Sequence, residues 1–126
     1  MKFVDYFVED RIAHVVMNRG PVNALSMDLV CEILEAYRLA KADSDVRCVM
    51  LESGLPKVFC AGMDLEMMRG GDSVRIRDYL EKLYLDMHLA QYRMAKPTIA
   101  VVNGAARAAG VTVAVSCDCI LASDRA

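Results

Sequence analysis

The sequence predicts an α/β fold in which two strands and a helix form a unit that is then repeated. Short runs of β-branched and apolar residues alternate with longer stretches whose apolar residues recur at helical spacing. Clusters of glycine, proline and small polar residues separate them. Strands that alternate with helices in this way form layered α/β folds. The chain has 126 residues, of which 56% are hydrophobic and 25% charged, and this suits one domain with a sizeable core.

The first unit begins with a hairpin. Residues 3–8 and 11–17 are strand-like, and the polar residues 9–10 between them suit a turn. His14 falls inside the second strand, where a structural role is commoner for a lone histidine than that of a base or ligand. Ser26 then has the character of a helix N-cap, and the expected helix carries apolar residues at Leu29, Val30, Ile33, Leu34 and Tyr37.

The second unit repeats this order. Residues 46–51 predict a mostly buried strand, and the glycine and proline of residues 53–56 end it. Residues 70–73 interrupt the chain again and can cap a second amphipathic helix that runs to about Met94. The apolar stripe expected on that helix is Ile76, Leu80, Leu83, Met87 and Ala90.

The last third of the chain begins after Lys96 and Pro97. Residues 98–102 are β-branched and apolar, which predicts a strand, and the residues Asn103 and Gly104 turn the chain. Residues 105–116 are compatible with a helix, and residues 119–122 with another short strand.

Composition and charge exclude several classes of function. The formal charge of -2 and the lack of basic runs with interleaved aromatic residues argue against nucleic-acid binding. We find neither a signal-peptide pattern nor an apolar run of the roughly 18 residues that a membrane span needs, so the expected location is the cytoplasm. The cysteines predict neither a disulfide framework nor a metal site, because they are odd in number and lack paired C-x-x-C spacing: Cys31, Cys48, Cys60, Cys117 and Cys119.

Two stretches carry the most chemical information. Residues 58–65 have the sequence VFCAGMDL, and residues 96–104 have the sequence KPTIAVVNG. In each stretch a strand ends in a loop, so backbone N–H groups from the two loops can be aimed at one point. Two N–H groups that converge in this way stabilise an oxyanion.

These stretches resemble the enoyl-CoA hydratase/isomerase family, also called the crotonase superfamily. The matching landmarks occur in order along the whole chain: residues 21–25 (PVNAL), 59–65 (FCAGMDL), Lys96-Pro97 with Asn103-Gly104, and Cys117-Asp118. The resemblance implies a crotonase-like spiral of strand-strand-helix units, as in the ClpP/crotonase fold. Residues 1–126 would form a single domain that corresponds to the N-terminal half of the usual one, truncated before the C-terminal trimerisation helices. It also implies a homo-oligomer, a trimer or hexamer in the family, and we expect this chain to associate with itself.

The resemblance also implies a binding site for a coenzyme A thioester, which is a substrate and not a cofactor; no metal or other cofactor is expected. The backbone amides of Met63 and Ala109 would form the oxyanion hole, with Ala109 near a helix N-terminus that favours negative charge. Lys57 would approach the coenzyme A phosphates, although a simple solvated lysine is about as frequent. The other residues expected to bind the substrate are Ala24, Ala61, Gly62, Asp64 and Gly110.

Three departures from the family pattern affect the expected chemistry. The glycine run after Asn103-Gly104 is here AARAAG, and an alanine keeps its backbone amide in place provided that φ is negative. The hydratases carry a glutamate where this chain has Thr112, and threonine cannot act as a carboxylate base. The family's further glutamate falls beyond Ala126. The second departure favours the enoyl-CoA isomerases over simple hydratases, because the isomerases also lack this acid and share the Pro-Val-Asn loop of residues 21–23.

Two functions from different classes therefore remain open. The first is an enzyme of acyl-CoA and fatty acid metabolism with isomerase or hydratase (lyase) chemistry, in which the thioester enolate is stabilised and the general base is unidentified. Asp64, Asp118 and Asp124 are the carboxylates near the matched segments, and a role in holding its loop is expected for Asp64. The second is a catalytically silent crotonase-like fragment that acts as a binding or assembly module. Thiol redox chemistry at Cys117 and Cys119 is a weak third idea, because packing explains their spacing.

Overall fold

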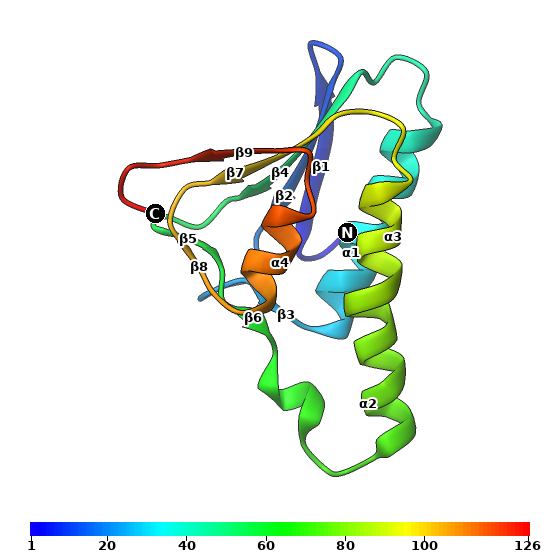
Figure 1. The fold of residues 1–126 in the computed structure, drawn as a ribbon, viewed down its shortest axis with the longest axis vertical. Coiled ribbons are helices and arrows are strands. Elements are labelled where there is room, and N and C mark those ends of the chain that lie inside the picture. The colour runs from blue at the N-terminus through cyan, green and yellow to red at the C-terminus, as the bar shows by residue number, and fades with distance from the viewer.

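The main feature of the computed structural model, which describes residues 1–126, is a five-stranded sheet with helices packed against one face (Figure 1). Its strand order is β1-β2-β4-β7-β9. The bounds are Val4–Glu9 for β1, Ile12–Met17 for β2, Cys48–Ser53 for β4, Thr98–Val102 for β7 and Cys119–Ala122 for β9. Only β1 and β2 are antiparallel; the other neighbours are parallel. The mixed α/β arrangement, in which strands alternate with helices, is the fold class that the sequence predicts.

The hairpin has its turn at Asp10 and Arg11, both of which have positive φ values (49° and 67°). Two such residues in a two-residue loop match the twist of the flanking strands. Alternation along β2 then buries Ala13, Val15 and Met17 beneath the helices, while His14 lies on the other face.

His14 has a structural environment. Its Nδ1 lies 2.6 Å from a carboxylate oxygen of Glu52, and its ring stacks on Phe7 with the ring centroids 4.6 Å apart. The expectation of a structural role agrees with these contacts.

Helix α1 (Met27–Ala42) begins where the sequence predicted. The Ser26 Oγ accepts a hydrogen bond from the amide of Leu29 at 3.3 Å, and Asp28 lies in the first turn. The buried face of this helix covers the sheet and contains Leu29, Val30, Ile33, Ala36, Tyr37 and Ala40.

The second helical region is continuous but not uniform. A short 3₁₀ helix, Leu65–Met68, precedes α2 (Ser73–Leu80), which Asp72 caps; a π-helical segment, Glu81–Asp86, joins α2 to α3 (Met87–Tyr92). The fully buried residues are Tyr79, Leu83, Met87 and Gln91, spaced by four, whereas Ile76, Leu80 and Ala90 of the predicted stripe are only partly buried. The wider turn of a π-helix explains the shift, because residues four apart stay closer to one face there than in an α-helix.

The predicted helix over residues 105–116 is wrong in its first part. Residues Ala105–Ala106 form a strand, β8, and helix α4 spans only Ala109–Val115. The local preference of alanine for helix is overridden because β8 pairs with β5 (Val58–Cys60). A second small sheet pairs β3 (Ala24–Leu25) with β6 (Gly62–Met63).

The core lies between the sheet and the helices, and 26 buried hydrophobic residues form it as one cluster. The last part of the chain differs: every residue of β9 is exposed, and so are Val111 and Val115 on α4. None of the helices is both long and apolar enough to cross a membrane.

Candidate active site

The two informative stretches of the sequence meet in space, and we call residues 57–63 together with 104–110 the junction. The Lys57 carbonyl accepts a hydrogen bond from the Ala105 amide at 3.1 Å, and the Cys60 carbonyl accepts one from the Arg107 amide at 2.9 Å. A Cβ atom added to Gly104 would lie less than 3.0 Å from the backbone of Lys57. The two segments are therefore in direct backbone contact.

Gly62 brings the strand that contains Met63 against the start of α4. Its φ of +95° is a conformation that glycine adopts readily and other residues rarely do. A Cβ added there would lie 2.7 Å from the carbonyl oxygen of Arg107 and 3.0 Å from the amide nitrogen of Ala109. Only a residue without a side chain allows this approach.

The turn before Ala109 has a glycine-like backbone although the residue is alanine. Ala108 has φ 46° and ψ −123°, a region that residues with a Cβ seldom occupy. Ala109 is the first residue of α4, is buried, and is not among the residues with positive φ. An alanine keeps its backbone amide in place where φ is negative, and Ala109 meets this condition. The unfavourable backbone conformation is that of the preceding residue, Ala108.

Asn23 holds the loop beside the junction. It is fully buried with φ 50°, and its Nδ2 donates to the carbonyl oxygens of Met17 (3.3 Å) and Phe59 (3.0 Å) and to Ser53 Oγ (2.9 Å). Its Oδ1 accepts from the amide of Arg19 at 2.8 Å. One side chain thus ties the ends of β2 and β4 to the middle of β5.

Asp64 follows Met63 and is engaged in structural contacts. Its carboxylate forms an ion pair of 2.9 Å with Arg19 and accepts from the Glu66 amide at 3.1 Å. Its amide donates to the Tyr79 hydroxyl at 3.2 Å, and that hydroxyl donates to the Leu25 carbonyl. Burial raises the pKa of Tyr79 to about 12, so the phenol remains a neutral donor. These contacts agree with the expectation that Asp64 holds its loop.

The remaining predicted substrate-binding residues lie in and around the junction. Ala24 pairs with Gly62 between β3 and β6, and Gly110 packs so closely on Cys60 that an added Cβ would lie 2.9 Å from the Cys60 Cβ. Lys57 is exposed and has φ 62°. Ala61 lines a hollow of about 230 Å³ together with Val22, Val58, Ala105 and Arg107.

Sequence reasoning missed Arg107 and the central position of Asn23. Arg107 is the one charged residue within residues 104–110, and this was a usable signal. Asn23 carried a weaker one, since asparagine is among the few residues other than glycine that tolerate a positive φ.

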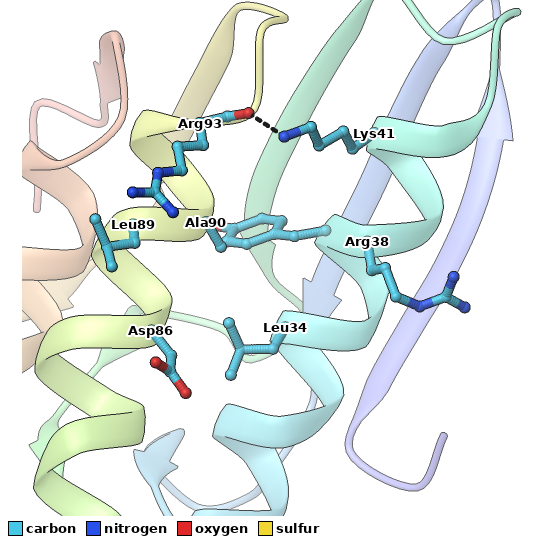
Figure 2. A pocket seen from close by; sticks show the side chains of 8 residues that line it. Leu34, Arg38, Lys41, Asp86, Leu89, Ala90 and Arg93 are labelled. Carbon is cyan, nitrogen blue, oxygen red and sulfur yellow. Dashed lines mark hydrogen bonds between the residues drawn. The ribbon is translucent and has the colours of Figure 1, made fainter.

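A separate hollow of about 350 Å³ lies between α1 and α3, away from the junction (Figure 2). Leu34, Leu89 and Ala90 line it together with charged side chains, and Lys41 Nζ donates to the carbonyl oxygen of Arg93 at 2.6 Å. None of the predicted site residues lines this hollow.

A family model described as enoyl-CoA hydratase/isomerase matches residues 8–126. The chain belongs to this family. Rat mitochondrial enoyl-CoA delta isomerase 1 is 30% identical over 119 residues, which are 92% of this chain and 40% of the rat protein. The structure of Pseudomonas aeruginosa DspI matches all of the chain and 51% of its own length, with a TM-score of 0.94 and 25% identity. The human mitochondrial delta3-delta2-enoyl-CoA isomerase matches 94% of the chain and 46% of its own length, with a TM-score of 0.88 and 28% identity.

This member of the enoyl-CoA hydratase/isomerase family spans no more than about half the length of the relatives it matches. The carboxylates of Asp64 and Asp118 are both engaged in structural contacts. The Thr112 hydroxyl donates to the carbonyl of Ala109 at 2.8 Å, and the Asp118 carboxylate accepts from the Thr98 amide at 2.8 Å. Asp124 is exposed near the end of the chain.

The cysteines give no support to redox chemistry. Cys117 is buried, which raises its pKa to about 11, whereas a reactive thiol needs a lowered pKa. Cys60 is likewise buried, its pKa is raised to about 11, and its Sγ donates to the carbonyl of Asn23 at 3.2 Å. Both thiols behave as core residues.

Proposed function

We propose that this chain binds an acyl-CoA thioester and stabilises its enolate with the backbone amides of Met63 and Ala109, as in isomerase or hydratase chemistry of its family. The observation that carries the proposal is the close approach at Gly62. A Cβ added to Gly62 would lie 3.0 Å from the amide nitrogen of Ala109, so the strand that contains Met63 lies directly against the start of α4. Two preorganised N–H donors are worth most when they point at charge that develops in the transition state.

The surroundings of the two amides support the same proposal. Ala109 is at the N-terminus of α4, where the helix dipole and unsatisfied amides favour negative charge. The close backbone packing of the junction would keep the two amides in place when the ligand binds, since residues 57–63 and 104–110 cannot shift against each other without a clash. Ala24, Ala61, Gly62, Asp64 and Gly110 would surround the thioester, and no metal or further cofactor is required for enolate stabilisation.

The test is an ultraviolet titration of the chain with acetoacetyl-CoA. An oxyanion hole that stabilises the enolate should give a saturable rise in enolate absorbance. No rise with a sample shown by circular dichroism to be folded would contradict the proposal.

A matched pair of variants makes the titration specific for the contact at Gly62. Gly62→Ala and Gly70→Ala both place an alanine at a positive φ (+95° and +87°), but only the Gly62 side chain meets the backbone of Arg107 and Ala109; nothing lies within 4 Å of Gly70. We expect the rise to be lost in Gly62→Ala and kept in Gly70→Ala. If Gly62→Ala does not fold, the wild-type titration still decides.

A catalytically silent binding module is the second function, and the engaged carboxylates favour it. The carboxylates of Asp64 and Asp118 both have structural hydrogen bonds, and residue 112 is a threonine, so no base is available among the three. This module would give the same enolate absorbance but no change in double-bond position. Incubation of the chain with a 3-enoyl-CoA, followed by chromatography of the thioesters, separates the two functions.

We also propose that the chain associates with copies of itself. Val111, Val115, Ile120 and Leu121 are between 42% and 60% exposed on α4 and β9, and β9 is an edge strand of the sheet. Exposed apolar patches beside an open strand edge favour association, and a second copy of the same chain offers a matching apolar face. A monodisperse monomer in light scattering at micromolar concentration would refute this.

A further inference from the structure

The hollow of about 230 Å³ at the junction is lined by one cationic side chain, which forms no ion pair within the chain. Four of its five lining residues are apolar, and the fifth is Arg107. Arg107 is exposed, and its guanidinium takes part in none of the six ion pairs of the chain. A lone guanidinium next to an apolar hollow is suited to an anionic group on a ligand that also has an apolar portion.

The backbone of Arg107 is fixed on both sides. Its amide donates to the Cys60 carbonyl at 2.9 Å, and its own carbonyl accepts from the Gly110 amide at 2.8 Å. The same carbonyl faces Gly62. The side chain therefore starts from a fixed point at the edge of the hollow, so that little backbone freedom is lost when it binds an anion.

The hollow also adjoins the place where the thioester is expected. Ala61 and Arg107 both line it, and each precedes one proposed oxyanion donor, Met63 or Ala109, by two residues. A ligand whose thioester oxygen lies between the two amides can extend its long arm past Ala61 toward Arg107.

We infer that Arg107 binds a phosphate group of the coenzyme A portion of the ligand, and that it sets the preference for coenzyme A over a shorter thiol. This inference rests on the proposed function. Coenzyme A carries a diphosphate and a 3′-phosphate, and a guanidinium binds phosphate oxygens through two parallel N–H donors.

Lys57 is the other cation near the junction and is less well placed. It does not line the hollow, and its backbone carbonyl accepts a hydrogen bond from the Ala105 amide. We therefore assign the phosphate contact to Arg107 instead of Lys57, and Lys57 serves as the control.

Three thioesters test the assignment: acetoacetyl-CoA, acetoacetyl-dephospho-CoA and acetoacetyl-pantetheine. They share the reacting group and differ in their phosphates. Each is titrated by enolate absorbance into the wild-type chain, Arg107→Gln and Lys57→Gln. We expect the wild type to bind the coenzyme A ester about tenfold more tightly than the pantetheine ester, as one charge-assisted contact provides. Arg107→Gln should remove this preference, and Lys57→Gln should keep it.

The outcomes are distinct. If the wild-type chain binds the dephospho ester as weakly as the pantetheine ester, Arg107 contacts the 3′-phosphate. If only the pantetheine ester binds more weakly, Arg107 contacts the diphosphate. Both results support the inference. An unchanged preference in Arg107→Gln, or an equal loss in Lys57→Gln, overturns it. No absorbance rise with any of the three esters in the wild type would instead show that the proposed function is wrong.

Discussion

The junction and the loop that follows it, residues 65–72, both depend on glycine but in opposite ways. At the junction, a Cβ on Gly62, Gly104 or Gly110 would lie closer than 3.0 Å to another atom of the chain. In the loop, Gly70 and Gly71 have positive φ values but nothing within 4 Å of an added Cβ. The junction requires glycine for close backbone approach, whereas the loop requires it only for backbone conformation.

This difference shows how the chain holds a backbone-based site. Amide donors can be positioned only by the backbone around them, so two segments must pack without intervening side chains. The neighbouring loop has exposed residues such as Leu65 and Met68, and side chains added at Gly70 or Gly71 would meet no other atom of the chain within 4 Å. Stability should therefore be lost at the junction and largely kept in the loop.

The largest expected effect is that of Gly104→Ala. Its Cβ would meet the carbonyl carbon and oxygen of Lys57, and backbone atoms cannot move aside as a flexible side chain can. We expect a loss of about 3 kcal/mol or more in the free energy of unfolding, measured by urea denaturation. Gly20→Ala is the matched control, since Gly20 also lacks a positive φ but has nothing within 4 Å; it should change stability by about 0.5 kcal/mol or less. Equal stabilities for the two variants would show that the junction is not closely packed.

Asn23→Ala should have the next largest effect. It leaves the carbonyl oxygens of Met17 and Phe59 without their donor in a buried site, and it places alanine at φ 50°. We expect a loss of about 2–3 kcal/mol in the free energy of unfolding. Asn18→Ala removes an exposed amide whose side chain makes one hydrogen bond, of 3.3 Å to Asp5, and it should cost little. A small effect of Asn23→Ala in urea denaturation would mean that the loop does not depend on this side chain.

Local signals in the sequence were sufficient for most of the fold. The hairpin, the cap at Ser26 and the strand over residues 98–102 each depend on neighbours in the sequence, and the structure has all three. The break near Asp72 was also visible, because a capping residue is recognised by its own side chain.

The junction itself could be predicted only in part, because its shape depends on contacts between distant residues. The alanines of residues 105–108 favour helix on their own, and only the pairing with Val58–Cys60 makes two of them a strand. No local pattern shows that Asn23 contacts three strands, or that Arg107 borders a hollow with Val22 and Ala61. The π-helical segment Glu81–Asp86 was missed for the same reason.

A pH titration of stability separates the buried thiol of the junction from an exposed one. Burial raises the pKa of Cys60 from 9.0 to about 11, so the folded state keeps this proton at pH values where the unfolded chain loses it. The resulting stability is fully present below pH 9.0 and is lost as the pH rises toward about 11. Two pKa units correspond to about 2.7 kcal/mol at most, and we expect on the order of 2 kcal/mol. Urea denaturation between these pH values should therefore show a smaller loss for Cys60→Ala than for the wild type, and an unchanged loss for Cys119→Ala, which replaces an exposed side chain. Identical pH profiles for Cys60→Ala and the wild type would contradict the assignment.

Ala108→Gly should have the smallest effect and the opposite sign. Ala108 has a Cβ and yet adopts a backbone conformation, φ 46° and ψ −123°, that favours glycine. Relief of this strain should exceed the extra entropy that glycine loses on folding, and we expect a gain of about 1 kcal/mol in the free energy of unfolding. The neighbouring Ala106→Gly, within β8 at a residue without positive φ, should instead lose stability. A loss of stability for both variants in urea denaturation would show that the turn before Ala109 is not strained.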